Sequence, residues 1–154
     1  MKLLILNGPN LNLLGVRNTK LYENETLEEI NTHLSAVAET MGISLLFAQS
    51  NREGELIDCL QATRGVCAGV VFNPGAYALT SYALRDTIAS LEIPVVEVLM
   101  PLFAREDLGR QSVLSPVCLG TISGFGADGY DLALTALAFR LNQSIPKLDE
   151  PKES

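Results

Sequence analysis

Three residues able to do acid–base chemistry stand close together near the start of the chain: Asn10, Arg17 and Tyr22. A phenol with an ordinary pKa of about 10 is only about 0.1% ionised at neutral pH. A guanidinium in contact with it lowers that pKa by roughly 1–3 units, so Arg17 could activate Tyr22 as a general base. Asn10 could then position a water or an oxyanion. The alternative interpretation is a turn at Gly8 and Pro9, with Arg17 as a surface charge.

A second group of polar residues lies further along the chain and comprises Asn73, Asp86, Glu97, Arg105 and Arg110. Glu97 stands inside an apolar run, so its carboxylate must be paired or lie at the edge of a pocket. The arginines beyond it could bind an anionic substrate or form surface ion pairs. Taken singly, each member of this group favours a structural interpretation.

Residues 124–129 have the spacing G-x-G-x-x-G, which in the right context binds dinucleotides. Here the motif follows the last predicted strand, so no further strand remains to complete a βαβ unit or to supply a ribose-binding acid. We therefore interpret these glycines as close packing of a helix on a strand, and expect no NAD-type cofactor.

The elements that must position these residues alternate between buried strands and amphipathic helices. The predicted strands are residues 3–6, 43–47, 69–72, 95–100 and 117–122. Helical spacing of apolar residues predicts a helix over 27–41, with Thr26 as N-cap and Gly42 as its stop. Further helices are expected after residue 50, over 81–91 and over about 130–141.

This order predicts an α/β fold, a flavodoxin-like, three-layer, doubly wound five-stranded parallel sheet. We expect one domain over residues 1–143 and a polar C-terminal tail over 144–154. Ligands in such sheets bind beyond the carboxyl ends of the strands, which is where the polar residues described above fall.

The composition of the chain limits which partners it can bind and which cellular compartment we expect. The formal net charge of −7 argues against binding to nucleic acid or to an anionic membrane. No apolar run is long enough to span a membrane, and the first is too short for a signal peptide. The 3 cysteines form no C-x-x-C pair, which predicts reduced thiols and a cytoplasmic location.

Taken together, the segments resemble the type II 3-dehydroquinate dehydratase family from residue 4 to about residue 141. The matching blocks are residues 7–15 with Arg17 and Tyr22, then 49–51, 53–58, 73–77, 85–86, 93–98, 115–116, 124–126 and 129–130. The resemblance implies a flavodoxin-like fold and a homo-oligomer, a trimer-based dodecamer. It also implies dehydration of 3-dehydroquinate to 3-dehydroshikimate, without metal or cofactor, in aromatic biosynthesis or quinate breakdown.

The same resemblance implies roles for the candidate residues. Tyr22 is the base, on a mobile lid loop, that removes a proton beside the ketone, and Arg17 keeps it ionised. Asn10 organises water and the leaving hydroxyl. Asn73 contacts hydroxyls of this small-molecule substrate, and Asp86 is contributed to the site of an adjoining subunit.

The resemblance breaks where the family protonates the leaving group. Glu97 matches the acid that supports the catalytic histidine, but Leu99 stands in place of that histidine. Leu79 replaces a second pocket histidine. Met100 and Pro101 match the two residues whose backbone N–H groups bind the substrate carboxylate, and proline has no N–H.

The loop over residues 102–109 is one residue shorter than in the family. Arg105 matches its first arginine, whereas the second falls on Gly109, with Arg110 alongside. His33, the single histidine, lies in a predicted helix and is poorly placed to substitute.

Three functions stay open. The first is a 3-dehydroquinate dehydratase, impaired or altered, in which water or another donor replaces the histidine. The second is a re-purposed enzyme that enolises a less polar ketone. The third is a catalytically silent homologue that binds a metabolite or a partner.

Overall fold

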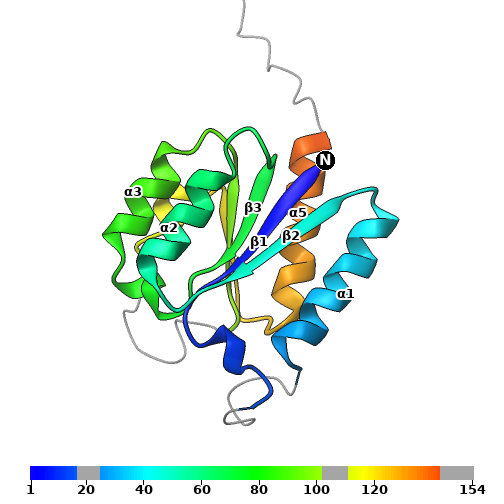
Figure 1. The fold of residues 1–154 in the computed structure, drawn as a ribbon, viewed down its shortest axis with the longest axis horizontal. Helices are drawn as coiled ribbons and strands as arrows, with labels where there is room; N and C mark the ends of the chain where they lie inside the picture. Colours follow the sequence, from blue (N-terminus) through cyan, green and yellow to red (C-terminus); the bar gives the residue numbers. More distant parts are fainter. Residues whose placement is uncertain (17–24, 102–110, 143–154) are drawn as a thin grey trace, which may run out of the picture.

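The structure, a computed structural model, describes residues 1–16, 25–101 and 111–142. In this part of the chain five strands form one parallel sheet in the order β2-β1-β3-β4-β5 (Figure 1). The strands are β1 (Lys2–Asn7), β2 (Ser44–Gln49), β3 (Gly69–Asn73), β4 (Val95–Leu99) and β5 (Gly120–Ser123). This order confirms the predicted flavodoxin-like, doubly wound sheet.

Among the residues that the structure describes, four α-helices cover the two faces of the sheet, giving three layers (Figure 1). Their bounds are α1 (Leu27–Thr40), α2 (Glu53–Ala62), α3 (Tyr82–Ser90) and α5 (Asp128–Asn142). One apolar cluster joins α1 and α5 to one face of the sheet, and a second joins α2 and α3 to the other. The strands β1, β3 and β4 are buried on both faces because each face is covered by helices, and most of their residues are apolar.

The first helix begins and ends as its sequence predicts. The Thr26 side chain accepts a hydrogen bond of 3.1 Å from the backbone N–H of Glu29, which satisfies one free donor of the first turn. Gly42 follows the helix with φ +69°, a left-handed conformation that glycine adopts without a Cβ clash.

The fifth strand begins three residues later than predicted, at Gly120. The preceding residues Ser115–Val117 form a short 3₁₀ helix, η3, with Pro116 near its start. The fixed φ of proline suits the first turn of such a helix, which favours the turn over an early strand. Val117 and Cys118 instead pack against the second apolar cluster.

Two further predictions concern membrane-spanning helices and the C-terminal tail. No helix within the described ranges is long and apolar enough to cross a membrane. The predicted tail lies outside the described residues.

Candidate active site

The sheet has one topological switch point, between β1 and β3, and it lies at the carboxyl ends of the strands. From β1 the chain passes to β2 on one side, whereas β3, β4 and β5 continue on the other. The connections that leave β1 and β3 therefore diverge, which opens a crevice for a ligand in sheets of this kind. Asn10 follows β1 and Asn73 ends β3, so both predicted site residues lie at this point.

Three amide side chains end the neighbouring strands in register. Asn7 of β1 is aligned with Gln49 of β2 on one side and with Asn73 of β3 on the other. Polar groups gather here because the apolar layers end with the strands. All three belong to blocks that match the family, but Asn7 and Gln49 had not been predicted as site residues.

The loops after β1 and β3 touch through their backbones. The N–H of Gly8 donates a hydrogen bond of 2.7 Å to the carbonyl of Asn73. A Cβ on Gly8 would lie 2.4 Å from the carbonyl oxygen of Pro74, closer than any side chain tolerates. Glycine is therefore required at this position for the two loops to meet.

Asn73 is buried at the switch point, where it bonds to a tyrosine from the last helix. Its side chain is only 3% exposed, and its Nδ2 donates to the hydroxyl of Tyr130 over 2.9 Å. Its Oδ1 accepts from the N–H of Gly75 over 3.1 Å. The Tyr130 hydroxyl in turn donates to Oδ1 of Asn7. Burial raises the pKa of Tyr130 well above its ordinary value, so this phenol stays protonated and acts structurally.

Asn10 has an unusual backbone. Its φ is +67°, and it is the one non-glycine residue with positive φ among the residues that the structure describes. It precedes the short 3₁₀ helix η1 (Leu11–Leu13), whose first turn its side chain does not cap. Its backbone N–H instead donates a hydrogen bond of 3.0 Å to Oδ1 of Asn51, which follows β2.

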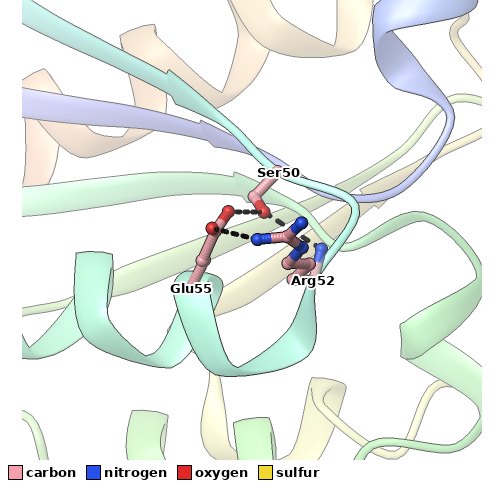
Figure 2. A network of polar contacts seen from close by, with 3 residues as sticks. All are labelled: Ser50, Arg52 and Glu55. Carbon is pink, nitrogen blue, oxygen red and sulfur yellow. Dashed lines mark hydrogen bonds and ion pairs between the residues drawn. The ribbon is translucent and has the colours of Figure 1, made fainter.

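The segment after β2 is itself held firmly. Ser50 donates a hydrogen bond to the carboxylate of Glu55, and the backbone N–H of Arg52 donates back to the Ser50 hydroxyl over 3.0 Å (Figure 2). The Arg52 guanidinium lies 3.2 Å from the same carboxylate. The hydrogen bond from Ser50, with the charge of Arg52, holds the pKa of Glu55 below its ordinary value.

Glu97 is buried in β4 with its charge satisfied by hydroxyl groups. Ser112 and Ser115 each donate to the carboxylate over 2.5 Å, and Thr121 donates over 2.9 Å. The prediction that this carboxylate must be paired is confirmed. None of the surface of Glu97 is exposed, and its contact with a substrate stays a prediction.

Apolar side chains occupy the end of β4. Leu99 is 5% exposed and Met100 is 6% exposed. A catalytic group at this position would need access to solvent or to a ligand. The backbone carbonyls of Leu99 and Met100 accept hydrogen bonds of 3.0 and 2.9 Å from the N–H groups of Gly124 and Gly126. The carbonyl of Pro101 accepts one of 3.1 Å from Ser123.

The glycine-rich motif does what the sequence predicts. A Cβ on Gly129 would lie 3.1 Å from Cγ1 of Val98, so the glycine lets α5 pack closely against β4. The motif therefore closes the loop between β5 and α5 against the end of β4.

The outcome differs among the remaining predicted residues. Asp86 is exposed on α3. His33 is exposed on α1, where its Nε2 lies 2.8 Å from Oδ1 of Asp131 on α5, so it is committed to a surface pair. Arg17, Tyr22, Arg105 and Arg110 lie outside the described residues. Within the described ranges no cluster of three His, Cys, Asp or Glu residues could hold a metal ion.

Known proteins resemble this chain over most of its length. The family model described as dehydroquinase class II matches residues 1–138. A 3-dehydroquinate dehydratase of Ruegeria pomeroyi is 51% identical over 141 residues, covering 91% of this chain and 95% of that protein. The 3-dehydroquinate dehydratase 2 of Pseudomonas aeruginosa is 51% identical over 138 residues, covering 89% and 93%. The crystal structure of a type II dehydroquinase from Butyrivibrio crossotus is 40% identical, with a TM-score of 0.84, and covers 89% of this chain and 97% of that one.

Proposed function

The chain belongs to the class II dehydroquinase family, and from this membership we propose that it is a lyase that dehydrates 3-dehydroquinate to 3-dehydroshikimate. The observation that carries the proposal is the family match over residues 1–138. The position of Asn10 and Asn73 at the switch point of the sheet supports it, because a ligand of such a fold binds there.

In the proposed reaction Tyr22, as phenolate, removes the proton on the carbon next to the ketone, and the electron pair moves into an enolate. Arg17 keeps Tyr22 ionised through its positive charge. The enolate then re-forms the ketone as the carbon–oxygen bond to the β-hydroxyl breaks and a new double bond forms. Asn10 holds the water and the departing hydroxyl, which leaves as water after it gains a proton.

The proposed site lacks a side chain that would donate this last proton. Leu99 and Leu79 cannot donate a proton, and loss of a general acid commonly lowers a rate by about 10²–10⁴-fold. Pro101 has no N–H to offer a substrate carboxylate. We therefore propose that dehydration is slow or altered and that water supplies the proton.

A second candidate function is favoured by the same apolar residues. A homologue that keeps Asn10, Arg17 and Tyr22 but lines the opposite wall with hydrocarbon is suited to bind, or to enolise, a less polar small ketone. Such a ligand would need neither acid-assisted loss of hydroxide nor a carboxylate anchor. Asn73 lies at the switch point and is proposed to contact either ligand.

We also propose that the protein works as a trimer-based homododecamer in the cytoplasm, with Asp86 reaching an adjoining subunit. The exposure of Asp86 on α3 supports this, because an exposed carboxylate can meet a second copy. Arg105 and Arg110 remain proposed contacts for an anionic substrate, and Met100 a proposed backbone contact.

The test is turnover of 3-dehydroquinate by the purified protein, followed through the absorbance of the conjugated enone product. Tyr22→Phe should abolish any turnover, whereas Tyr82→Phe, at a tyrosine 63% exposed on α3, should leave it unchanged. If folded wild-type protein gives no product, dehydration is excluded. Hydrogen–deuterium exchange next to the carbonyl of cyclic ketones without a carboxylate then tests the second candidate, with Tyr22→Phe again as control.

A further inference from the structure

The backbone of Asn10 has a left-handed conformation that is uncommon for residues other than glycine. Left-handed φ is unfavourable for residues with a Cβ, and asparagine tolerates it better than most. The side chain of Asn10 makes no capping bond to η1 that would explain the conformation locally. Pro9 before it suits a type II turn, whose third residue has positive φ, so the local sequence permits the conformation and a hydrogen bond from outside the loop can fix it.

The contact that holds it comes from Asn51. Oδ1 of Asn51 accepts a hydrogen bond of 3.0 Å from the N–H of Asn10, across 41 residues of sequence. This hydrogen bond fixes the orientation of the peptide plane between Pro9 and Asn10, and so restrains the turn that carries the Asn10 side chain.

The amide of Asn51 is itself oriented by its neighbours. Nε2 of Gln49 donates to Oδ1 of Asn51 over 3.1 Å and to the carbonyl of Gly8 over 3.1 Å. These donors require oxygen, rather than nitrogen, on the side of Asn51 that faces Asn10. The hydroxyl of Tyr77 donates to the backbone carbonyl of Asn51 over 2.9 Å, which fixes its main chain from the loop after β3.

The loops that follow the three neighbouring strands thus meet at one residue. Asn10 follows β1, Asn51 follows β2, and Tyr77 lies in the 3₁₀ helix η2 (Gly75–Leu79) after β3. Ser50 and Arg52 on either side of Asn51 are tied to Glu55, so the residue stands between two anchored neighbours (Figure 2).

We propose that Asn51, oriented by Gln49, is a positioning residue that holds Asn10 in its left-handed conformation and so directs the Asn10 side chain into the active site. The catalytic consequence rests on the proposed function, whereas the conformational part does not. Asn51 acts through the backbone of Asn10 and does not itself touch the substrate.

Two variants of Asn51 separate its hydrogen bond from its bulk. Asn51→Leu has nearly the same shape and no acceptor, whereas Asn51→Asp keeps the Oδ1 acceptor. In crystal structures, φ of Asn10 should leave the left-handed region in Asn51→Leu and stay there in Asn51→Asp. A φ that stays near its wild-type value in Asn51→Leu would overturn the proposal, whatever the activity.

Kinetics test the catalytic part. Misplacing a catalytic group by about 1 Å costs on the order of 100-fold, so Asn51→Leu should lower kcat by roughly 10–100-fold with little change in KM. Asn51→Asp should restore most of kcat. Equal kcat in Asn51→Leu and wild type, in an active protein, would contradict the proposal.

Combination with Asn10→Ala distinguishes positioning from a general loss of stability. If Asn51 acts only through Asn10, adding Asn51→Leu to Asn10→Ala should lower kcat no further. Multiplied losses would show that Asn51 acts independently and would overturn the proposal. If the wild type has no dehydratase activity, the proposed function fails, and φ of Asn10 in the two Asn51 variants still decides the conformational part.

Discussion

The hydroxyl of Tyr130 accepts a hydrogen bond of 2.9 Å from Nδ2 of Asn73, which ties the last helix to the end of the third strand. The same hydroxyl donates to Asn7, so one buried phenol joins α5 to the carboxyl ends of both strands that border the switch point. Tyr130 and Asn73 lie 57 residues apart in sequence, and they meet because the sheet brings the ends of β1 and β3 together under the start of α5.

Replacement of Tyr130 by phenylalanine should destabilise the protein without changing its fold. The ring would still fill its site, but the amides of Asn7 and Asn73 would each lose a buried partner, at a cost of about 1–3 kcal/mol. Urea unfolding measures this as a lower free energy of unfolding. Tyr82→Phe, at an exposed tyrosine, is the control, and equal losses in both variants would contradict the role given to this hydroxyl.

Gly8→Ala should be far more damaging than alanine at a glycine with free space. The new Cβ would lie 2.4 Å from the backbone oxygen of Pro74, so the loops after β1 and β3 would have to separate. Gly54→Ala is the matched control, because nothing lies within 4 Å of its Cβ and α2 would gain roughly 0.5–1 kcal/mol. Thermal unfolding should show a clear decrease in Tm for Gly8→Ala and none for Gly54→Ala.

Restoring two histidines should increase dehydratase turnover if the missing acid limits the reaction. Leu99→His with Leu79→His supplies a proton donor for the departing hydroxyl, and kcat should rise by about 10²–10⁴-fold. KM should stay high, since Pro101 still lacks an N–H for the substrate carboxylate. Leu119→His, at a leucine 42% exposed, is the control. A folded double variant with unchanged kcat would show that the apolar wall reflects another ligand.

Glu55 should contribute to stability only while it is ionised. Its folded pKa lies below the ordinary value because Ser50 and Arg52 favour the carboxylate. The contribution is therefore complete above the pKa of the unfolded chain and disappears as pH falls through the lower folded pKa. The difference in unfolding free energy between wild type and Glu55→Gln should be small near neutral pH and vanish at acid pH, whereas a difference that grows on acidification would contradict this sign. Glu53→Gln, in the same turn of α2, is the control.

The cysteines should react slowly in the native protein. Burial, aided by the nearby charge of Glu97, raises the pKa of Cys118 to about 12, and burial also raises the pKa values of Cys59 and Cys67. At pH 8 a thiol with that pKa is about 0.01% thiolate, the reactive form. A disulfide reagent should detect all 3 thiols after unfolding and very little before it. Cys118→Ser should reduce the unfolded count by one, and rapid native labelling would contradict the burial.

The sequence alone determined the fold class and the layers, because its information on these is local. Apolar runs such as residues 3–6 mark strands buried on both faces, and Thr26 and Gly42 mark the ends of the first helix. The order of these elements fixes a doubly wound sheet and places Asn10 and Asn73 at its carboxyl edge. The start of β5 was misplaced, since a run of apolar residues after Pro116 does not reveal that it turns before it pairs with β4.

Only the tertiary structure decided which polar groups support the site, because hydrogen bonds between distant residues leave no local pattern. The bond from Asn10 to Asn51 spans 41 residues, and that from Tyr130 to Asn7 spans 123. Sequence reasoning required Glu97 to be paired, but its hydroxyl partners appear only when β4, β5 and η3 are placed together. Residue types fixed what chemistry is available, and packing fixed which groups remain free to do it.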